Sequence, residues 1–301
     1  MPTDRRQFRA FALLALVMLL WAGNSIIGRA VRGDVGPFTL AFVRWAGASL
    51  VLLPFAVGPV RRDWQVLLRA WPIVLVLGLT GVAAFNALMY SGLHYTTATN
   101  GLLLQAAIPP AVLLADRVLF GVRPARGQII GIAGSMAGVA VIVFQGTLAH
   151  VLAFRFGMGD VLVLIAVADW AVYTVLLRRR PAVSPLSFLA ATFLVGVIAM
   201  APLAAWETLT GPAIRWSAGL GGAFLYVALL PSLVAYLIYN QAAETLGPAR
   251  AGQAITLLPL FGALLSAALL GETLHPFHFA GMALILVGIV VSALAPREAR
   301  R

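Results

Sequence analysis

Apolar segments of about twenty residues recur along the whole 301-residue chain, separated by short stretches that carry many of its glycines, prolines and charges. A helix of this length crosses the roughly 30 Å hydrocarbon core of a bilayer. Hydrophobic residues make up 61% of the sequence and charged residues only 10%, far below the roughly one quarter typical of soluble domains. So few charges could not solvate the surface of a folded monomer of 31.8 kDa. The sequence therefore predicts an all-α integral membrane protein that is embedded in the lipid bilayer.

Composition also removes several kinds of chemistry. Cysteine is absent, so the chain has no disulfide, no thiolate nucleophile and no Cys-ligated zinc. The four histidines lack the H-E-x-x-H spacing of a zinc site, and no G-x-x-x-x-G-K-[ST] phosphate-binding loop occurs. All 21 basic residues are arginines, and they lie at the ends of the apolar segments instead of on one patch. We therefore expect no catalytic residues, no metal, no cofactor and no nucleic-acid partner.

Apolar windows between glycine, proline and charged residues give ten candidate membrane spans. The spans run over residues 10–29, 37–58, 71–91, 97–119, 127–146, 159–177, 185–206, 218–240, 250–270 and 276–294. Arg5, Arg6 and Arg9 before the first apolar run resemble the start of a signal peptide, but no small-residue cleavage site follows. We expect a retained first helix. The loops are short, so any function is expected among the helices.

The arginines predict the orientation of the spans. With the N-terminus in the cytoplasm, sixteen arginines fall in cytoplasmic segments, four fall in external loops, and Arg44 lies within the second span. Short cytoplasmic loops carry an excess of basic residues, and this distribution holds only for an even number of spans. Both termini are therefore predicted to be cytoplasmic.

The chain also aligns with itself. At an offset of 150 residues, the fourth and fifth spans match the ninth and tenth over about forty residues without a gap. The matched pairs are Pro109 with Pro259, Leu119 with Leu269, Gly121 with Gly271, Gly131 with Gly281, and Gly138 with Gly288. Trp21 matches Trp170, and Tyr90 matches Tyr239, at an offset of 149.

Two five-helix halves, 11–146 and 159–294, follow from this alignment. Because five is an odd number, the second half enters the membrane in the opposite sense. The charges agree, since the loop after the fourth span carries three arginines, whereas its counterpart after the ninth carries Glu272 and His275 and no arginine. Inverted repeats are the architecture of many secondary transporters.

The stretch Leu257–Glu272, LLPLFGALLSAALLGE, and the glycine-spaced helix after it resemble the EamA domain of the drug/metabolite transporter superfamily. Trp21–Asn24 (WAGN) and Arg44 fit the same pattern. The resemblance covers nearly the whole chain. It implies ten transmembrane helices, with spans one to four and six to nine around a central cavity and spans five and ten at the periphery. The first half has Val122 where the second has Glu272, so the Gly-Glu pair of the family occurs only once.

Within this superfamily, length, aromatic content and the Arg- and Trp-bearing early spans look most similar to bacterial amino-acid exporters of the YddG type. That resemblance implies a multi-pass secondary transporter of the bacterial inner membrane, monomeric or homodimeric. Its small-molecule substrates would be aromatic and other neutral amino acids, exported by alternating access with or without proton coupling. A cationic drug or another metabolite is the alternative cargo.

Two other classes are not expected. An intramembrane enzyme would need a nucleophile with its base, or a metal triad at one depth, and no Ser/His or His/Asp set lies within the spans. A receptor or scaffold would ordinarily carry an extramembrane output domain, for which the short loops leave no room.

Polar and aromatic side chains within the spans are the candidates for the cavity wall, because polar groups in a membrane usually face a cavity or a neighbouring helix. The candidates are Trp21, Asn24, Gly28, Arg44, Asn86, Tyr90, Gln105, Asp169, Trp170, Tyr173, Ser232, Tyr236, Tyr239, Gln253 and Thr256. Aromatic walls with scattered amides and hydroxyls suit a zwitterion with an apolar side chain. Hydrogen bonding between helices is the alternative interpretation of the same residues.

Asp169 lies about ten residues into the sixth span and therefore near mid-membrane. It is a candidate for binding a proton or a substrate ammonium group. The alternative, which we favour because an isolated buried charge is costly, is a structural ion pair with Arg44 at similar depth.

Pro109 and Pro259 are predicted to lie mid-helix at equivalent places in the two halves. Each would remove a backbone donor and kink its helix. We expect a hinge for gating, with a fixed bend as the alternative.

Overall fold

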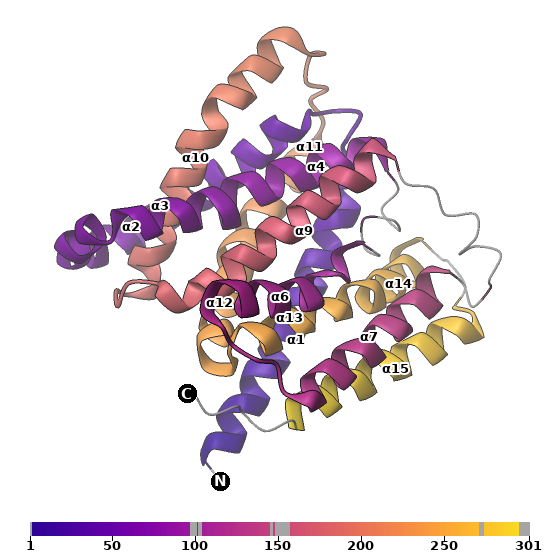
Figure 1. Ribbon diagram of the computed structural model, residues 1–301. Helices are drawn as coiled ribbons and strands as arrows, with labels where there is room; N and C mark the ends of the chain where they lie inside the picture. The colour runs from indigo at the N-terminus through magenta and orange to yellow at the C-terminus, as the bar shows by residue number, and fades with distance from the viewer. Residues whose placement is uncertain are drawn as a thin grey trace.

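The computed structural model describes residues 2–96, 101, 104–144, 147, 157–270 and 274–294, and within these ranges the chain is helical with short connections (Figure 1). The helices of the first half are α1 (Pro2–Ala30), α2 (Pro37–Arg69), α3 (Trp71–Gly78), η1 (Leu79–Ala84), α4 (Phe85–Tyr95), α6 (Ile108–Phe120) and α7 (Arg126–Val143). Those of the second half are α9 (Met158–Leu176), η2 (Leu177–Arg179), α10 (Pro185–Thr210), α11 (Ala218–Ala228), η3 (Leu229–Val234), α12 (Ala235–Leu246), α13 (Pro248–Gln253), η4 (Ala254–Thr256), α14 (Leu257–Leu270) and α15 (Pro276–Leu294).

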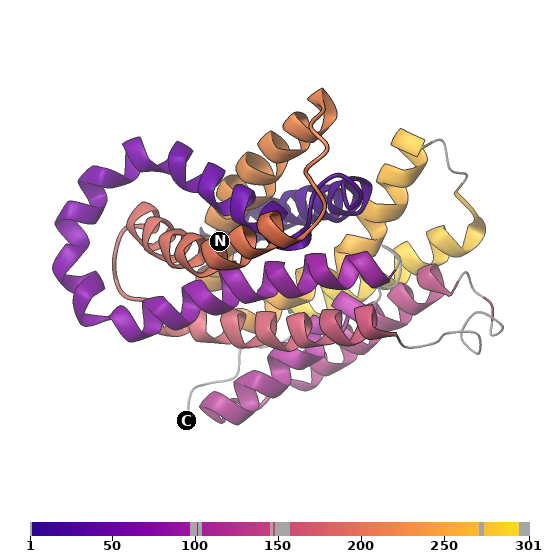
Figure 2. The same ribbon diagram turned by 90° about the horizontal axis from the view of Figure 1, so that it is seen from above.

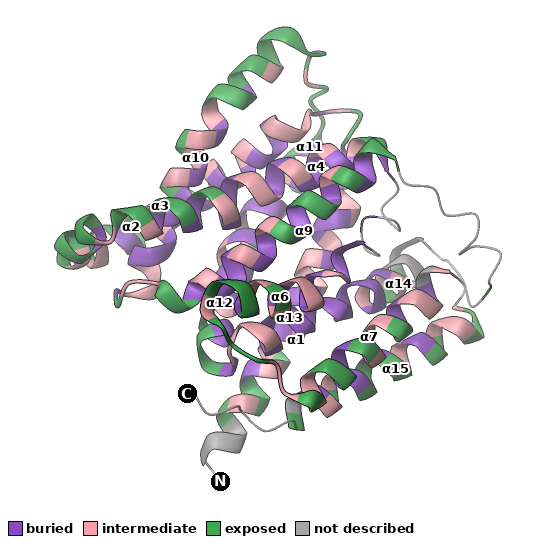
Figure 3. Cartoon of the chain, in the orientation of Figure 1, coloured by how far each residue is buried: buried purple, intermediate pink, exposed green. Residues whose placement is uncertain are grey.

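The outer surface has the character expected in lipid. Six helical stretches of the described chain are long and apolar enough to cross a membrane, and α7 and α15 are shorter apolar helices. Large apolar side chains cover the outward faces of α2, α10 and α15 (Figure 3); Leu50, for example, is 71% exposed and Val287 is 60% exposed. In water such a surface would be unfavourable, so the predicted helical membrane fold is confirmed.

The sequence places the helix ends. Proline, which has no N–H to lose in a first turn, opens α2, α10 and α15. The hydroxyls of Ser184 and Ser217 accept the backbone N–H groups of Ser187 and Leu220, in the first turns of α10 and α11. Gly121 and Gly247 adopt positive φ angles of 68° and 87° where α6 and α12 end, a conformation that glycine adopts without strain.

Equivalent residues of the two halves meet at the centre of the molecule. The Trp21 and Trp170 rings, 149 residues apart in sequence, have centroids 5.2 Å apart. The Trp45 and Phe193 rings, 148 residues apart, have centroids 4.8 Å apart. Contacts between matched positions are what a two-fold relation between inverted halves produces, and they support the repeat found in the sequence.

Short π-helical segments interrupt two spans at matched places. Leu79–Ala84 in the third span and Leu229–Val234 in the eighth are 150 residues apart. This register makes Asn240 the counterpart of Tyr90, and not Tyr239 as the sequence match had indicated. π-Helical turns shift the side chains beyond them around the helix and free backbone carbonyls, and they are frequent at functional sites.

Six of the spans form two bundles, and each bundle includes one helix from the other half of the chain. Bundle A contains the third span (α3, η1 and α4), α6 and α9, because α9 packs on both α4 and α6. Bundle B contains the eighth span (α11, η3 and α12), the ninth (α13, η4 and α14) and α1, because α1 packs on both α12 and α14. Each bundle therefore takes two spans from one half and one from the other, as the inverted symmetry requires.

α7 and α15 pack on each other, side by side in Figure 1 and apart from α2 and α10. Gly131 faces Gly288 and Gly138 faces Gly281, so the two helices run antiparallel. The Ser135 hydroxyl donates to a carbonyl of α15, that of Ile285, at 3.2 Å. Gly131 and Gly138 thus serve the packing of these two helices, as expected from small residues at membrane helix contacts.

α2 and α10 form a second pair outside bundles A and B, and each supplies an acid to the start of the other. The Glu207 carboxylate, late in α10, accepts the Thr39 backbone N–H and hydroxyl at 2.7 Å each. The Asp63 carboxylate, late in α2, accepts the Ser184 backbone N–H at 2.9 Å. α2 contains prolines within the helix and follows a curved path, seen at the left of Figure 2. These bonds hold the pair together at both ends.

Candidate functional site

A central cavity lies between bundles A and B. Its walls come from the first, second, third, fourth, sixth, eighth and ninth spans. The lining residues are Trp21, Asn24, Ser25, Arg44, Phe85, Asn86, Met89, Gln105, Ile108, Trp170, Tyr236, Ile255 and Leu258. The cavity volume is about 30 Å³, close to the share of one water molecule in the liquid. A substrate of several heavy atoms therefore requires the bundles to move apart.

Arg44 is the charged residue of this cavity wall. Its side chain is only 2% exposed. Nη1 donates to the Asn86 amide oxygen at 2.8 Å and the Tyr90 hydroxyl at 3.1 Å, and Nε donates to the Ser232 hydroxyl. Nη2 donates to the Pro231 carbonyl at 3.1 Å. Both acceptors from the eighth span lie in its π-helical segment, so that segment positions the guanidinium.

Among the residues that the structure describes, no acid pairs with this charge. Every hydrogen-bond acceptor that the structure gives Arg44 is a neutral amide, hydroxyl or carbonyl oxygen, and the cavity lining contains no Asp or Glu. The guanidinium also lies 4.7 Å from the centroid of the Trp45 ring, a favourable cation–π contact. Neutral partners satisfy the donors but leave a net positive charge beside the cavity.

An aromatic cluster forms one side of the cavity and continues behind it. Trp21 touches the rings of Trp170, Tyr236 and Tyr239, with centroids 5.1–5.8 Å apart. Tyr173 packs on Trp170 at 5.0 Å. Such rings offer a wall for an apolar or aromatic side chain and a face for a cation.

Among the hydrogen bonds between bundles A and B, one matched pair lies on opposite sides of the Trp21–Trp170 contact. The Tyr90 hydroxyl of α4 donates to Asn24 Oδ1 of α1 at 2.8 Å. The Tyr173 hydroxyl of α9 donates to Asn240 Oδ1 of α12 at 2.7 Å. These two bonds are equivalent in the repeat, with the Tyr and Asn exchanged between the partner helices.

The candidates from the sequence fall into three groups. Trp21, Asn24, Arg44, Asn86, Gln105, Trp170 and Tyr236 line the cavity. Gly28, Tyr90, Tyr173, Ser232 and Tyr239 contact those residues or one another from behind. Asp169, Gln253 and Thr256 do not line it: Gln253 donates to the Gly288 carbonyl of α15 at 3.0 Å, and Thr256 donates to the Gln253 carbonyl.

Two further expectations were wrong. Asp169 forms no ion pair with Arg44; it is partly exposed, and its Oδ2 is buried without a hydrogen-bond partner in the described chain. Pro109 and Pro259 do not lie mid-helix and do not kink continuous helices, whereas their role as a hinge for gating stays a prediction. They lie in the first turns of α6 and α14, after breaks at 106–107 and 254–256, where a missing N–H costs little.

Sequence reasoning missed Phe85 and Met89, which line the cavity on α4. Phe85 and Met89 are four residues apart and directly precede Asn86 and Tyr90, so helical spacing could have identified them. Ile108, Ile255 and Leu258 carried no such signal, because apolar residues of a membrane span face lipid and cavity alike.

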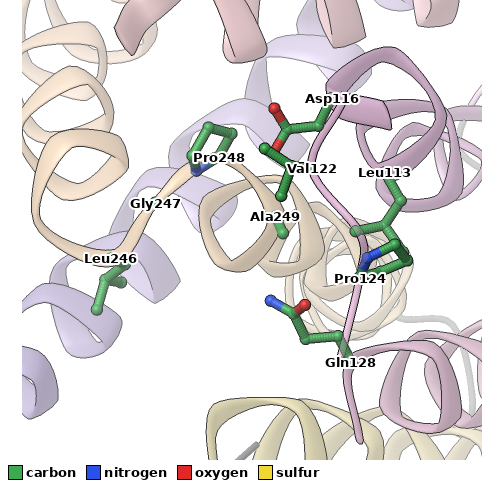
Figure 4. A pocket seen from close by; sticks show the side chains of 9 residues that line it. All are labelled: Leu113, Asp116, Val122, Pro124, Gln128, Leu246, Gly247, Pro248 and Ala249. Carbon is green, nitrogen blue, oxygen red and sulfur yellow. The ribbon is translucent and has the colours of Figure 1, made fainter. Parts of the chain in front are cut away.

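A second cavity, of about 120 Å³, opens on the side that the arginines assign to the cytoplasm (Figure 4). It lies between the end of α6 and the α12–α13 junction, and therefore between bundles A and B. Asp116 at its wall pairs with Arg178, and nearby Arg180 of bundle A pairs with Glu244 of bundle B at 2.7 Å. The two bundles are thus also linked at their cytoplasmic ends.

Comparisons with known proteins agree with this architecture. The chain matches the EamA-like transporter family over residues 8–144 and again over 157–294. It is 30% identical to an uncharacterized transporter of Archaeoglobus fulgidus, over 93% of this chain and 96% of that protein. A solved crystal structure has a TM-score of 0.71 at 22% identity and covers 94% of this chain and 96% of its own, which shows the fold alone.

Two other relatives have more informative names. The chain is 28% identical to a probable terminal-alkyne amino-acid exporter of Streptantibioticus cattleyicolor, over 94% of this chain and 93% of that protein. It is 25% identical to the uncharacterized inner membrane transporter YedA of Escherichia coli, over 96% of this chain and 92% of that protein. With matches in both halves, this chain is a multi-pass membrane transporter, not an enzyme, and it belongs to the EamA-like transporter family of the drug/metabolite transporter superfamily.

Proposed function

We propose that the protein exports aromatic and other neutral amino acids across the bacterial inner membrane by alternating access. The observation that carries this proposal is Arg44, a buried guanidinium beside the central cavity whose hydrogen-bond partners are all neutral. A buried charge is favourable only when it is paired. A substrate carboxylate would supply the missing partner, since arginine matches carboxylate geometry with two parallel hydrogen bonds.

The rest of the wall suits the remainder of an amino acid. The rings of Trp21, Trp170 and Tyr236 offer apolar surface for a neutral side chain and electron-rich faces for an ammonium group. Gln105 adds an amide to the same wall. The cavity contains no acid among its lining residues, which favours a carboxylate-bearing substrate over a simple cation.

The names of two relatives support the proposed transport of amino acids. One is named a probable amino-acid exporter and another an inner membrane transporter, and the chain spans more than nine tenths of both. The inverted halves supply the two matched bundles that alternating access requires. Whether the protein works as a monomer or a homodimer stays a prediction.

Flux from proteoliposomes tests the substrate class. Vesicles of purified protein are loaded with labelled phenylalanine or with labelled phenethylamine, which differs only by lacking the carboxylate. We expect phenylalanine to leave at least tenfold faster than from protein-free vesicles and phenethylamine to stay at that background. Efflux of the amine alone would replace this proposal with the cationic cargo, and efflux of neither would reject both.

Asp169 is the proposed site of proton coupling. Its Oδ2 is buried and has no hydrogen-bond partner among the described residues, and its backbone neighbour Trp170 lines the cavity. We expect Asp169→Asn to retain phenylalanine efflux down its own gradient and to lose the stimulation by an imposed pH gradient. The measurement is initial efflux with and without the gradient, for both proteins. Equal stimulation of the variant and the wild type would exclude Asp169 as the proton site.

A further inference from the structure

The geometry points to two matched Tyr–Asn hydrogen bonds, Tyr90–Asn24 and Tyr173–Asn240, as the outer and inner gates of transport. We call the Tyr90–Asn24 bond the outer latch and the Tyr173–Asn240 bond the inner latch. Each latch joins bundle A to bundle B. Because bundles A and B are exchanged by the inverted symmetry, one latch is the image of the other.

The latches lie on opposite sides of the substrate cavity. On α1, Asn24 follows Trp21 by three residues toward the predicted outer side; on α9, Tyr173 follows Trp170 by three residues toward the predicted inner side. Since Trp21 and Trp170 are in contact, the rise of an α-helix puts one latch roughly 4–5 Å above and the other roughly 4–5 Å below that contact. Both are closed in this structure, which accounts for a cavity of only about 30 Å³.

Opening to one side must break the latch on that side and can keep the other. A bundle rocking about the tryptophan contact separates atoms above it and compresses those below. Hydrogen bonds are lost within about 1 Å of such separation, so each latch behaves as closed or open. Removing one hydroxyl should therefore favour the conformation that is open on the same side.

The two latches differ in what reinforces them. Arg44 donates to the Tyr90 hydroxyl at 3.1 Å and, weakly, to Asn24 Oδ1 at 3.4 Å, so the outer latch is tied to the group proposed to bind substrate. The position matching Arg44 in α10 is Thr192, whose hydroxyl donates only to carbonyls of its own helix. Each side also has a further bond between the bundles: Arg29 Nη1 donates to the Leu93 carbonyl at 2.6 Å on the outer side, and the Thr174 and Tyr239 hydroxyls pair at 3.0 Å on the inner side.

This difference couples substrate to the outer side. A carboxylate on Arg44 competes with Tyr90 and Asn24 for the guanidinium and so weakens the outer latch. Within the described chain, the hydrogen-bond partners of the inner latch are uncharged, so a carboxylate on Arg44 leaves that latch intact. The coupling rests on the proposed function, whereas the latches themselves can be tested without any substrate.

The chain has no cysteine, so single thiol reporters can be introduced without background. Ser25→Cys is the outer reporter, on the outer side of the cavity, and Ala243→Cys, one turn beyond Asn240 on α12, is the inner reporter; both positions are buried in this structure. A membrane-impermeant maleimide is applied to vesicles of each orientation without substrate. We expect Tyr90→Phe to raise labelling of the outer reporter roughly two- to tenfold and to lower labelling of the inner reporter.

The inner variant should do the reverse. Tyr173→Phe is expected to raise labelling of the inner reporter and to lower that of the outer reporter, while the bond between Thr174 and Tyr239 remains. Adding Thr174→Val should enlarge the effect. Tyr226→Phe is the matched control: its hydroxyl donates to the Leu20 carbonyl at 3.0 Å within bundle B, so neither reporter should change.

Two results would overturn the proposal. One is equal labelling changes at both reporters in each variant, which indicates general loosening; the other is no change at either. Combining Tyr90→Phe with Tyr173→Phe should return the ratio of outer to inner labelling toward the wild-type value. If the two tyrosines had only a structural role, the double variant would instead show the largest increase in labelling at both reporters. Phenylalanine should raise labelling of the outer reporter when both latches are intact. If it does not while the variants behave as expected, the amino-acid proposal fails and the latches stand.

Discussion

Arg44→Gln is expected to reduce phenylalanine efflux from proteoliposomes by roughly 30- to 1000-fold. Removing one partner of a buried charge pair costs about 2–4 kcal/mol, which converts to that range. Glutamine keeps hydrogen-bonding capacity toward Asn86, Tyr90 and Ser232, so the fold loses less than with an apolar replacement. The loss should appear mainly in the apparent affinity for substrates that carry a carboxylate.

Two variants separate charge from packing. Arg44→Lys keeps the positive charge but offers one point of contact instead of a planar fork, and we expect intermediate transport. Thr192→Val changes the matched position in α10, and we expect nearly wild-type transport. Comparable losses in Arg44→Gln and Thr192→Val, with both proteins folded, would contradict a direct role for the guanidinium.

Gly131→Ala is expected to destabilise the protein by about 1–3 kcal/mol, the range seen for overpacking. A Cβ there would lie 2.5 Å from the Gly288 carbonyl oxygen and 2.7 Å from the Ser292 backbone nitrogen. Real Cβ atoms do not approach backbone atoms so closely, so α7 and α15 would have to separate. Thermal unfolding in detergent should show a midpoint lower by roughly 3–10 °C.

Gly134→Ala is the matched control on the same helix. A Cβ at this position would meet only the Gly288 Cα, at an ordinary 3.7 Å. Alanine also favours helix over glycine by up to about 1 kcal/mol, so the melting temperature should stay the same or rise. Equal destabilisation by the two alanines would show that the close packing of α7 on α15 is not what limits stability.

The long spans were predictable because lipid imposes one strong rule, an apolar run of sufficient length. The self-alignment matched Gly131 with Gly281, but the packing of α7 on α15 came from the structure, because small residues indicate close helix contact without naming the partner helix. The π-helical turns at Leu79–Ala84 and Leu229–Val234 were not visible, because they depend on acceptors and ring contacts supplied by other helices. Without them the register of the third and eighth spans was wrong by one residue.

The sequence predicted which types of residue form the candidate site better than it predicted which individual residues line the cavity. Residues such as Arg44 and Asn86, whose burial in a membrane costs free energy, stand out in an apolar sequence, and both lie at the cavity. Asp169 stands out equally but lies outside the cavity lining, because the helical face that meets the cavity depends on which neighbours pack against α9. The acceptor role of the Pro231 carbonyl had no side-chain signal at all.

The reciprocal bonds between α2 and α10 have a mechanical consequence. Glu207 fastens one end of the pair and Asp63 the other, so sliding either helix by a single residue rise, about 1.5 Å, would strain both attachments together. The pair therefore resists shear along its length while still allowing its members to bend about the prolines of α2. It would act as a strut of constant length beside two rocking bundles, so that their motion is a tilt and not a vertical displacement across the membrane.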